Sequence, residues 1–211
     1  MTAERLRFTK NKSAIVVVAH PDDETIWMGG FILKHPQMSW TIFSLCRASD
    51  SDRAQKFLHV CQRYKARAII TDLEDDGKLN LRQTLPIIKK IMLQRIKNKK
   101  FDYIFTHGFN GEYGHPRHIG VYRVVSQLVN KQILKPEAVF YFNYTKKSRK
   151  KFAPPFAKKN SDLQLKLTNQ KFAQKKKIMT DIYGFAPNSI DVNYCTNLEA
   201  FKIKLSAKQP G

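Results

Sequence analysis

The feature that most constrains the fold is a regular alternation of short apolar segments with longer segments of helical periodicity. Residues 14–19 (AIVVVA) form a continuous, largely β-branched run, typical of a central strand buried on both faces. Further strands are expected at residues 39–45, 68–71, 101–106 and 138–142, and helices at residues 24–35, 50–66, 81–96 and 116–129. This order predicts an α/β fold, a Rossmann-like three-layer α/β/α sandwich with a mostly parallel sheet.

The pattern is less regular after residue 142. Residues 146–160 contain a basic run around two prolines and predict an exposed loop, whereas residues 170–182 suit a helix. No internal repeat and no second domain is evident. We therefore expect a single domain over residues 1–211, with the basic loop and the C-terminal segment as parts of it.

The charge of the chain is strongly one-sided. It has 38 Lys and Arg against 17 Asp and Glu, a net charge of +21, and residues 146–177 hold 12 of the basic residues and one acid. Such a field favours an anionic partner, whether nucleic acid, a phospholipid surface or a phosphorylated substrate. No motif of a specific nucleic-acid binder is present, so the lysine-rich surface of a soluble enzyme is the favoured interpretation.

The sequence also bounds the location of the protein. No apolar stretch approaches the roughly 18 residues of a membrane span, and peripheral contact with a membrane is possible. The first dozen residues lack the apolar region of a signal peptide, and the three cysteines have no paired spacing. We expect buried free thiols and a cytoplasmic location.

Two clusters of ionisable side chains directly follow predicted strands: HPDDE at residues 20–24 and GEYGHPRH at residues 111–118. In parallel sheets, ligands bind beyond the carboxyl ends of the strands. His20 and one carboxylate three residues on could hold a divalent ion, and the neighbouring carboxylate could activate a water. The first cluster alone could merely cap a helix. The second cluster adds two histidines, and either His115 or His118 could complete a His–Asp–His site with the first.

AHPDDE at residues 19–24 and GHPRH at residues 114–118 resemble the LmbE-like, or PIG-L, family of zinc-dependent de-N-acetylases, over about residues 13–130. The resemblance implies a hydrolase that removes an acetyl group from an N-acetylated amino sugar or its conjugate, of the N-acetylglucosamine type. Zn²⁺ would be the cofactor, and Fe²⁺ would suit the same ligands. The partner would be an amino-sugar-containing small molecule or glycoconjugate, and the net charge favours an anionic one.

The resemblance also implies roles for individual residues. His20, Asp23 and His118 would hold the metal. Asp22 would be the general base that activates the attacking water and later protonates the leaving amine. A cationic His115 would stabilise the oxyanion of the tetrahedral intermediate.

Three further positions carry over from the family. Tyr113 would help to polarise the amide carbonyl, while Arg53 and Asp76 would contact the sugar. Many members have an acidic residue where this chain has Arg117. That cation would lower the pKa of His115, unless another carboxylate such as Glu112 substitutes.

Two alternatives to an active deacetylase stay open at this point. One is a family member that binds metal without activity, which the unusual arginine suggests. The other is a basic protein that binds nucleic acid or an anionic surface, which the net charge suggests.

Overall fold

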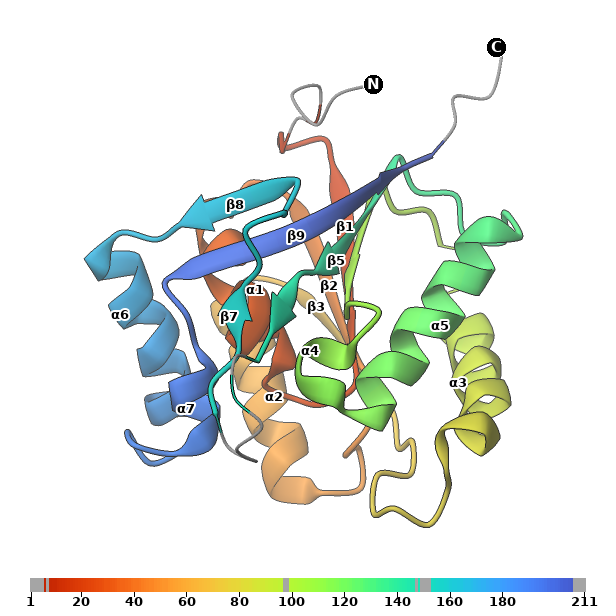
Figure 1. Ribbon diagram of the computed structural model, residues 1–211, viewed down its shortest axis with the longest axis horizontal. Coiled ribbons are helices and arrows are strands. Elements are labelled where there is room, and N and C mark those ends of the chain that lie inside the picture. The colour runs from red at the N-terminus through yellow and green to blue at the C-terminus, as the bar shows by residue number, and fades with distance from the viewer. Residues whose placement is uncertain (1–5, 7, 97–98, 147, 149–152, 207–211) are drawn as a thin grey trace.

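The computed structural model describes residues 6, 8–96, 99–146, 148 and 153–206, and its main element is a seven-stranded sheet of order β3-β2-β1-β4-β5-β9-β8 (Figure 1). The strands are β1 (Ser13–Val18), β2 (Ser39–Ser44), β3 (Arg67–Ile70), β4 (Tyr103–Thr106), β5 (Ala138–Phe142), β8 (Leu163–Lys166) and β9 (Leu198–Leu205). The helices are α1 (Asp23–Lys34), α2 (Ser51–Arg63), α3 (Leu81–Ile96), α4 (Gly111–Gly114), α5 (Pro116–Asn130), α6 (Asn169–Lys177), the π-helix η2 (Ile178–Ile182) and α7 (Ile190–Tyr194). A separate pair of two-residue strands consists of β6 (Tyr144–Thr145) and β7 (Phe156–Ala157).

Strand β1 lies at the centre of the parallel part of the sheet. It pairs in parallel with β2 on one side and with β4 on the other, so that Val16 lies between Ile42 and Phe105. Residues 14–19 have no exposed surface, which explains their continuous apolar character. Strands β3 and β5 extend this parallel arrangement, whereas β9 and β8 are antiparallel.

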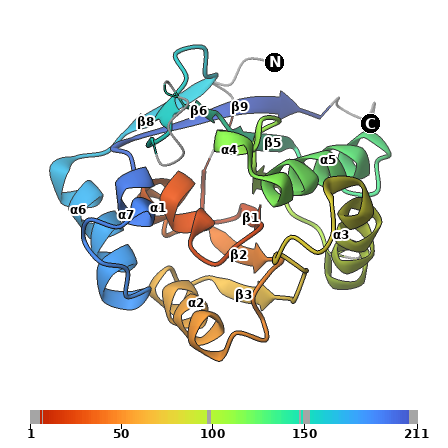
Figure 2. The same cartoon turned by 60° about the horizontal axis from the view of Figure 1, so that its bottom comes forward.

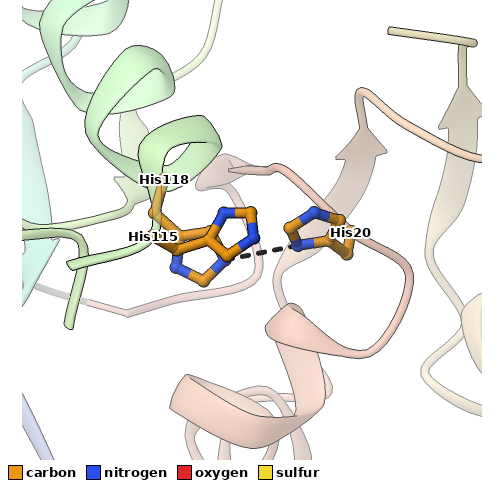
Figure 3. Close-up of side chains that lie close together, drawn as sticks. All are labelled: His20, His115 and His118. Atoms are coloured by element: carbon orange, nitrogen blue, oxygen red, sulfur yellow. Dashed lines mark hydrogen bonds between the residues drawn. The ribbon is translucent and has the colours of Figure 1, made fainter. Parts of the chain in front are cut away.

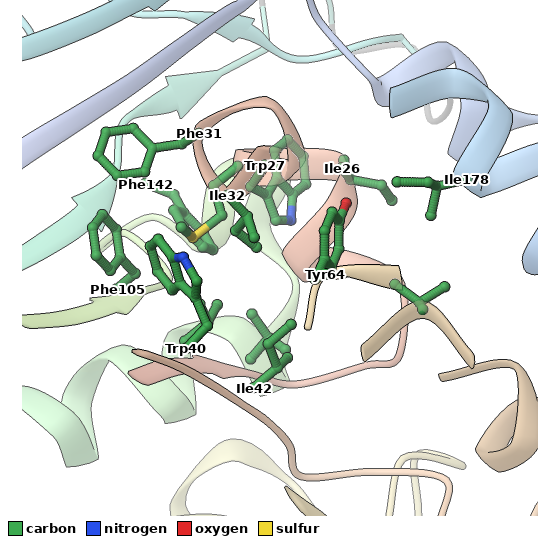
Figure 4. Close-up of a cluster of buried hydrophobic side chains, with 14 of the residues drawn as sticks. Ile26, Trp27, Phe31, Ile32, Trp40, Ile42, Tyr64, Phe105, Phe142 and Ile178 are labelled. Carbon is green, nitrogen blue, oxygen red and sulfur yellow. The ribbon is translucent and has the colours of Figure 1, made fainter. Parts of the chain in front are cut away.

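Helices cover both faces of the sheet (Figure 2). On one face α1 and α2 pack on a core rich in aromatic side chains, among them Trp27, Phe31, Trp40 and Phe105 (Figure 4). On the other face α3 and α5 pack side by side over an aliphatic core. The predicted three-layer α/β fold with a mostly parallel sheet is therefore confirmed.

The C-terminal third contains strands that the sequence analysis did not predict. Residues 198–205 form the long strand β9 between β5 and β8, and apolar and polar side chains alternate along residues 201–205. Within the predicted basic loop, β7 pairs with β6 and Pro155 is buried, so the loop is not uniformly exposed; residues 147 and 149–152 of it lie outside the described residues. The predicted helix at residues 170–182 divides into α6 and η2.

Helix α1 is interrupted at Met28, whose φ of −148° is not helical. The backbone N–H groups of Gly30 and Phe31 donate instead to the carboxylate of Glu199 on β9, at 2.8 and 2.6 Å. The ammonium of Lys175 on α6 lies 2.8 Å from the same carboxylate, and both side chains are fully buried. Strand β9 and helix α6 thus hold in place helix α1, which follows the first motif.

Two expectations about location can be compared with the structure. All three cysteines are buried and free, as expected. Among the described residues, no helix is long and apolar enough to cross a membrane.

Candidate metal centre and active site

The two motifs meet at the carboxyl ends of β1 and β4. His20 follows β1, and Asp23 begins α1. His115 and His118 lie at the start of α5, which β4 reaches through the short helix α4. Because β1 and β4 are neighbours in parallel, both motifs emerge at the same edge of the sheet.

Three donor atoms of these motifs form a nearly equilateral triangle. His20 Nδ1 lies 3.3 Å from His118 Nε2 (Figure 3). Asp23 Oδ2 lies 3.2 Å from His20 Nδ1 and 3.3 Å from His118 Nε2. Tetrahedral ligands with zinc bonds of about 2.0–2.1 Å are separated by about 3.3–3.4 Å. The three ligands implied by the resemblance therefore have the spacing that one zinc ion requires.

A second carboxylate supports each of the two histidines. His118 Nδ1 lies 2.7 Å from Glu112 Oε2, and His20 Nε2 lies 2.9 Å from Asp75 Oδ2. When these nitrogens carry the protons, the other ring nitrogens point their lone pairs at the centre of the triangle. The supporting carboxylates thus assign the tautomers that metal binding needs.

The electrostatics of the cluster favour a cation. Burial opposes charge on His20, yet Asp23 and Asp75 raise its pKa to about 9. Burial opposes charge on His118 in the same way, while Asp23 and Glu112 raise its pKa to about 10. The carboxylates thus hold positive charge at this place, whether as protons on the imidazoles or as a metal ion.

Asp23 is held by groups outside the triangle. The indole N–H of Trp27 donates to Oδ1 at 2.8 Å, and the backbone N–H of His20 donates to Oδ2 at 2.9 Å. Burial would raise the pKa of this carboxyl, but His118 and His107 hold it well below its usual value. The residue is therefore an anion with a fixed orientation.

His107, which follows β4, lies with Asp23 and His118 in a second group that could hold a metal ion, but both of its ring nitrogens have other partners. Its Nε2 lies 3.6 Å from Asp23 Oδ2, but this nitrogen accepts the backbone N–H of Ala19 at 3.0 Å. Its Nδ1 lies 2.7 Å from Glu112 Oε2. Because the lone pair of Nε2 is used, His107 orients Glu112, which in turn orients His118.

Asp22 has a strained backbone beside the triangle. Its φ is 120°, a region that residues other than glycine rarely occupy, and its N–H donates to Glu24 Oε2 at 3.1 Å. Its carboxylate accepts from Arg53 Nη1 at 3.3 Å. Burial and the charge of Asp23 raise its pKa well above the usual value, against the opposing effect of Arg53. A carboxylate with a raised pKa suits proton transfer near neutral pH.

His115 lies edge-on to the ring of His20, with ring centres 4.8 Å apart. Its Nδ1 accepts the backbone N–H of Arg117 at 3.3 Å, which leaves the proton of the neutral ring on Nε2. Burial, followed by the charges of His118 and His20, lowers its pKa to about 3. The geometry favours a neutral imidazole over the cation that the resemblance implies.

The side chain of Arg117 points away from His115. Its Nε donates to the carbonyl of Glu74 at 2.7 Å, and its Nη2 donates to the Glu74 carboxylate at 2.7 Å. Glu112 does not face His115 either, because its carboxylate is used by His107, His118 and the backbone N–H of Gly108. The arginine thus fixes the loop that carries Asp75.

The two predicted sugar contacts have different surroundings. Arg53 lies in the site, paired with Asp22 and stacked over the ring of Phe185 at 4.6 Å. The side chain of Asp76 is 60% exposed and faces the cation of Arg47 at 3.9 Å. Its neighbour Asp75 is the residue that reaches His20, and nothing in the sequence distinguishes the two aspartates. The contact of Asp76 with a substrate stays a prediction.

The cluster opens into a cavity of about 760 Å³. One wall is built by the two motifs and includes Tyr113, whose ring centre lies 5.3 Å from that of His118. The other wall comes from the C-terminal third, and its members are Lys146, Ser148, Ile190, Asp191 and Tyr194. The sequence analysis missed this wall, because it located the site from the ends of parallel strands, and these residues do not follow a parallel strand.

Comparisons with known proteins give a relative in sequence. The chain is 23% identical over 146 residues to an uncharacterized protein of Acanthamoeba polyphaga mimivirus, a match that covers 62% of this chain and 61% of that protein. The match thus spans about three fifths of that relative's length.

Solved structures share the fold at low sequence identity. The N,N'-diacetylchitobiose deacetylase of Pyrococcus horikoshii is 13% identical, with a TM-score of 0.62 over 92% of this chain and 84% of that one. The 4-carboxy-2-hydroxymuconate hydratase GalB of Pseudomonas putida is 14% identical, with a TM-score of 0.60 over 95% and 99% of the two chains. The fold thus occurs in proteins with different activities, and the residues of the site must decide the chemistry.

The family itself is decided by the sequence match. The family model for GlcNAc-PI de-N-acetylases, PIG-L, matches residues 15–129, which is more than half of the chain and includes both motifs. The chain therefore belongs to the PIG-L family of de-N-acetylases.

Proposed function

We propose that the protein is a zinc-dependent hydrolase that removes the acetyl group from an N-acetylated amino sugar or its conjugate. One observation carries this proposal: the triangle of His20, Asp23 and His118 donor atoms beside the half-buried carboxylate of Asp22, which lines the cavity. Membership of the PIG-L family supports it.

The metal would be held by His20 Nδ1, Asp23 Oδ2 and His118 Nε2, with Asp75 and Glu112 fixing the two imidazoles. Bound zinc would polarise the amide carbonyl and lower the pKa of a water toward about 7. A mixed set of nitrogen and oxygen donors also suits Fe²⁺.

Asp22 would act as the base and then as the acid. Its carboxylate takes the proton of the attacking water as the oxygen bonds to the amide carbon. It then gives this proton to the amino-sugar nitrogen as the C–N bond breaks, so that acetate and a free amine result. Arg53, at 3.3 Å, and the N–H bond to Glu24 keep the carboxylate in place through both steps.

His115 and Tyr113 would donate hydrogen bonds to the carbonyl oxygen as negative charge develops on it. For His115 the donor would be Nε2–H of a neutral ring, because Nδ1 is engaged with the backbone. A fixed neutral donor stabilises an oxyanion without a charge that must be buried beforehand.

Acetate release by the zinc-loaded protein tests the proposal. With N-acetylglucosamine, N,N'-diacetylchitobiose and N-acetylglucosamine phosphates as substrates, we expect acetate and free amine in equal amounts. Asp22→Asn should lower kcat by about 10²–10⁴, because it removes the general base, while zinc content stays at one ion per chain.

Stoichiometric zinc with no acetate from any of these compounds would contradict the proposal. That result would favour a family member that binds metal without this activity. Loss of zinc in Asp22→Asn would instead contradict the assignment of Asp22 as a general base that does not bind the metal.

A further inference from the structure

A tyrosine from the C-terminal third reaches the turn that carries Asp22. Tyr183 directly follows the π-helix η2, and its side chain is buried. Its phenol O–H donates to Glu24 Oε1 at 2.8 Å, a contact between residues 159 positions apart in the chain. π-Helices are rare and occur frequently at functional sites, which agrees with a role for this contact in the site.

Glu24 connects this tyrosine to the backbone of Asp22. The other carboxylate oxygen of Glu24, Oε2, accepts the backbone N–H of Asp22 at 3.1 Å. The hydroxyl of Thr25 donates to Oε1 at 2.6 Å and lies 3.0 Å from the hydroxyl of Tyr64. Because Glu24 has no exposed surface, these protein groups must supply the hydrogen bonds that water would give its carboxylate.

The backbone of Asp22 depends on such support because it is strained. A φ of 120° persists in a residue other than glycine only where the surrounding structure holds it. The carbonyl of Asp22 accepts the backbone N–H groups of Thr25 and Ile26 at 2.9 Å, as at an ordinary helix start. The N–H bond to Glu24 therefore holds the other side of the residue, and its loss would let the turn relax.

The ring of Tyr183 also bears on the side chain of Asp22, through Arg53. The guanidinium lies 6.0 Å from the ring centre of Tyr183 and 4.6 Å from that of Phe185. Its Nη1 donates to the carboxylate of Asp22 at 3.3 Å. One tyrosine thus contacts both groups that hold Asp22: Glu24 on its backbone and Arg53 on its carboxylate.

We infer that Tyr183 is a positioning residue, which keeps the general base Asp22 in its strained geometry beside the metal triangle. This inference rests on the proposed function and adds to it a residue outside both motifs and outside the family match at residues 15–129. Proton transfer depends steeply on the placement of the base, so the effect of Tyr183 belongs to kcat. Zinc and substrate are bound by other side chains.

Three substitutions in the full-length, zinc-loaded protein test the inference by acetate release. Tyr183→Phe removes only the hydroxyl and leaves the ring in place. Tyr64→Phe is the matched control, because its hydroxyl is also buried but reaches Glu24 only through Thr25. Asp22→Asn, alone and combined with Tyr183→Phe, shows whether the tyrosine acts through the base.

We expect Tyr183→Phe to lower kcat about tenfold or more, while KM and bound zinc change less than about twofold. Tyr64→Phe should change kcat less than about twofold. With Asp22→Asn already present, Tyr183→Phe should cause no comparable further loss, because a base that is absent cannot be misplaced. The same loss in both backgrounds, or in both tyrosine variants, would overturn the inference.

Hydrogen exchange of the Asp22 backbone N–H gives a second readout, which does not need activity. The bond to Glu24 protects this N–H, so Tyr183→Phe should speed its exchange about tenfold or more relative to the N–H groups of β1, whereas Tyr64→Phe should not. An unchanged relative rate in Tyr183→Phe would refute the inference. If no compound releases acetate, the proposed function fails, and this exchange rate alone decides whether Tyr183 holds the turn.

Discussion

The two walls of the cavity come from parts of the chain that are built in different ways. Residues 13–129 form parallel strands with helical crossovers, and they supply every donor atom of the metal triangle. The described residues from 144 to 205 add antiparallel strands and short helices, and they supply Lys146, Asp191 and Tyr194. The first part concentrates carboxylates and imidazoles, whereas the second part contributes one cation, one acid, a serine, an isoleucine and a tyrosine.

The difference shows how reaction and selectivity can be separated in one site. The triangle depends on two neighbouring strand ends, so any change there alters the chemistry itself. The far wall contains no candidate metal ligand among the cavity-lining residues and acts on what surrounds the acetamido group. Substitutions in the two parts should therefore have different kinds of effect. Three predictions test this difference.

The largest effect is expected for His118 compared with His107, two buried histidines whose rings stack 3.9 Å apart on the same Glu112. His118→Gln removes a donor of the triangle, so bound zinc and acetate release should both be lost. His107→Gln removes only a support, which typically costs about 10–100-fold in metal affinity. Metal analysis and acetate release, with circular dichroism as the control for folding, distinguish the two.

If both variants retained zinc equally well, the triangle would be assigned wrongly. If His107→Gln lost zinc and His118→Gln did not, the roles of the two histidines would be exchanged.

A smaller effect on chemistry, but a large one on stability, is expected for Glu199→Gln in the C-terminal part. The substitution leaves Lys175 buried without its counterion and weakens the bonds to Gly30 and Phe31. We expect a loss of about 3–5 kcal/mol in the free energy of unfolding, measured by urea denaturation of the metal-free protein. The double variant Glu199→Gln/Lys175→Met should recover part of it.

Recovery in the double variant would identify the unpaired buried charge as the cause. A stability equal to that of the unchanged protein in the single variant would show that the bonds to α1 contribute nothing.

The smallest of the three effects is expected for Glu112→Gln. The variant keeps a side chain of the same shape but weakens the hold on His118 Nδ1, so zinc affinity should fall about 10–100-fold. Competition with a chelator measures this change. At saturating zinc, kcat should return to within a few-fold of its original value, because the triangle itself is intact. A persistent deficit at saturating zinc would give Glu112 a part in the chemistry.

The sequence predicts the parallel part of the molecule better than the C-terminal part. The apolar run at residues 14–19 and the two motifs after strands were enough to place His20, Asp23 and His118 at one edge, because parallel neighbours end together. The contacts of Asp75 and Asp76 were beyond prediction, because these adjacent residues differ only in where the backbone directs their side chains. Those of Arg117 on α5 depend on the fold that brings Glu74 beside it. The C-terminal wall reaches the cavity through helix α7 and through the residues that follow β6, and the sequence pattern alone does not show that these segments fold back over the site.

The break in α1 at Met28 has a consequence for how the chain is made. During synthesis both motifs emerge early, yet the N–H groups of Gly30 and Phe31 have no carboxylate to bind until Glu199 has left the ribosome. Helix α1, which begins at Asp23, therefore reaches its final form among the last events of folding. A nascent chain that stops short of β9 would carry both motifs and still lack the contacts that hold α1, and with it Asp23, in place.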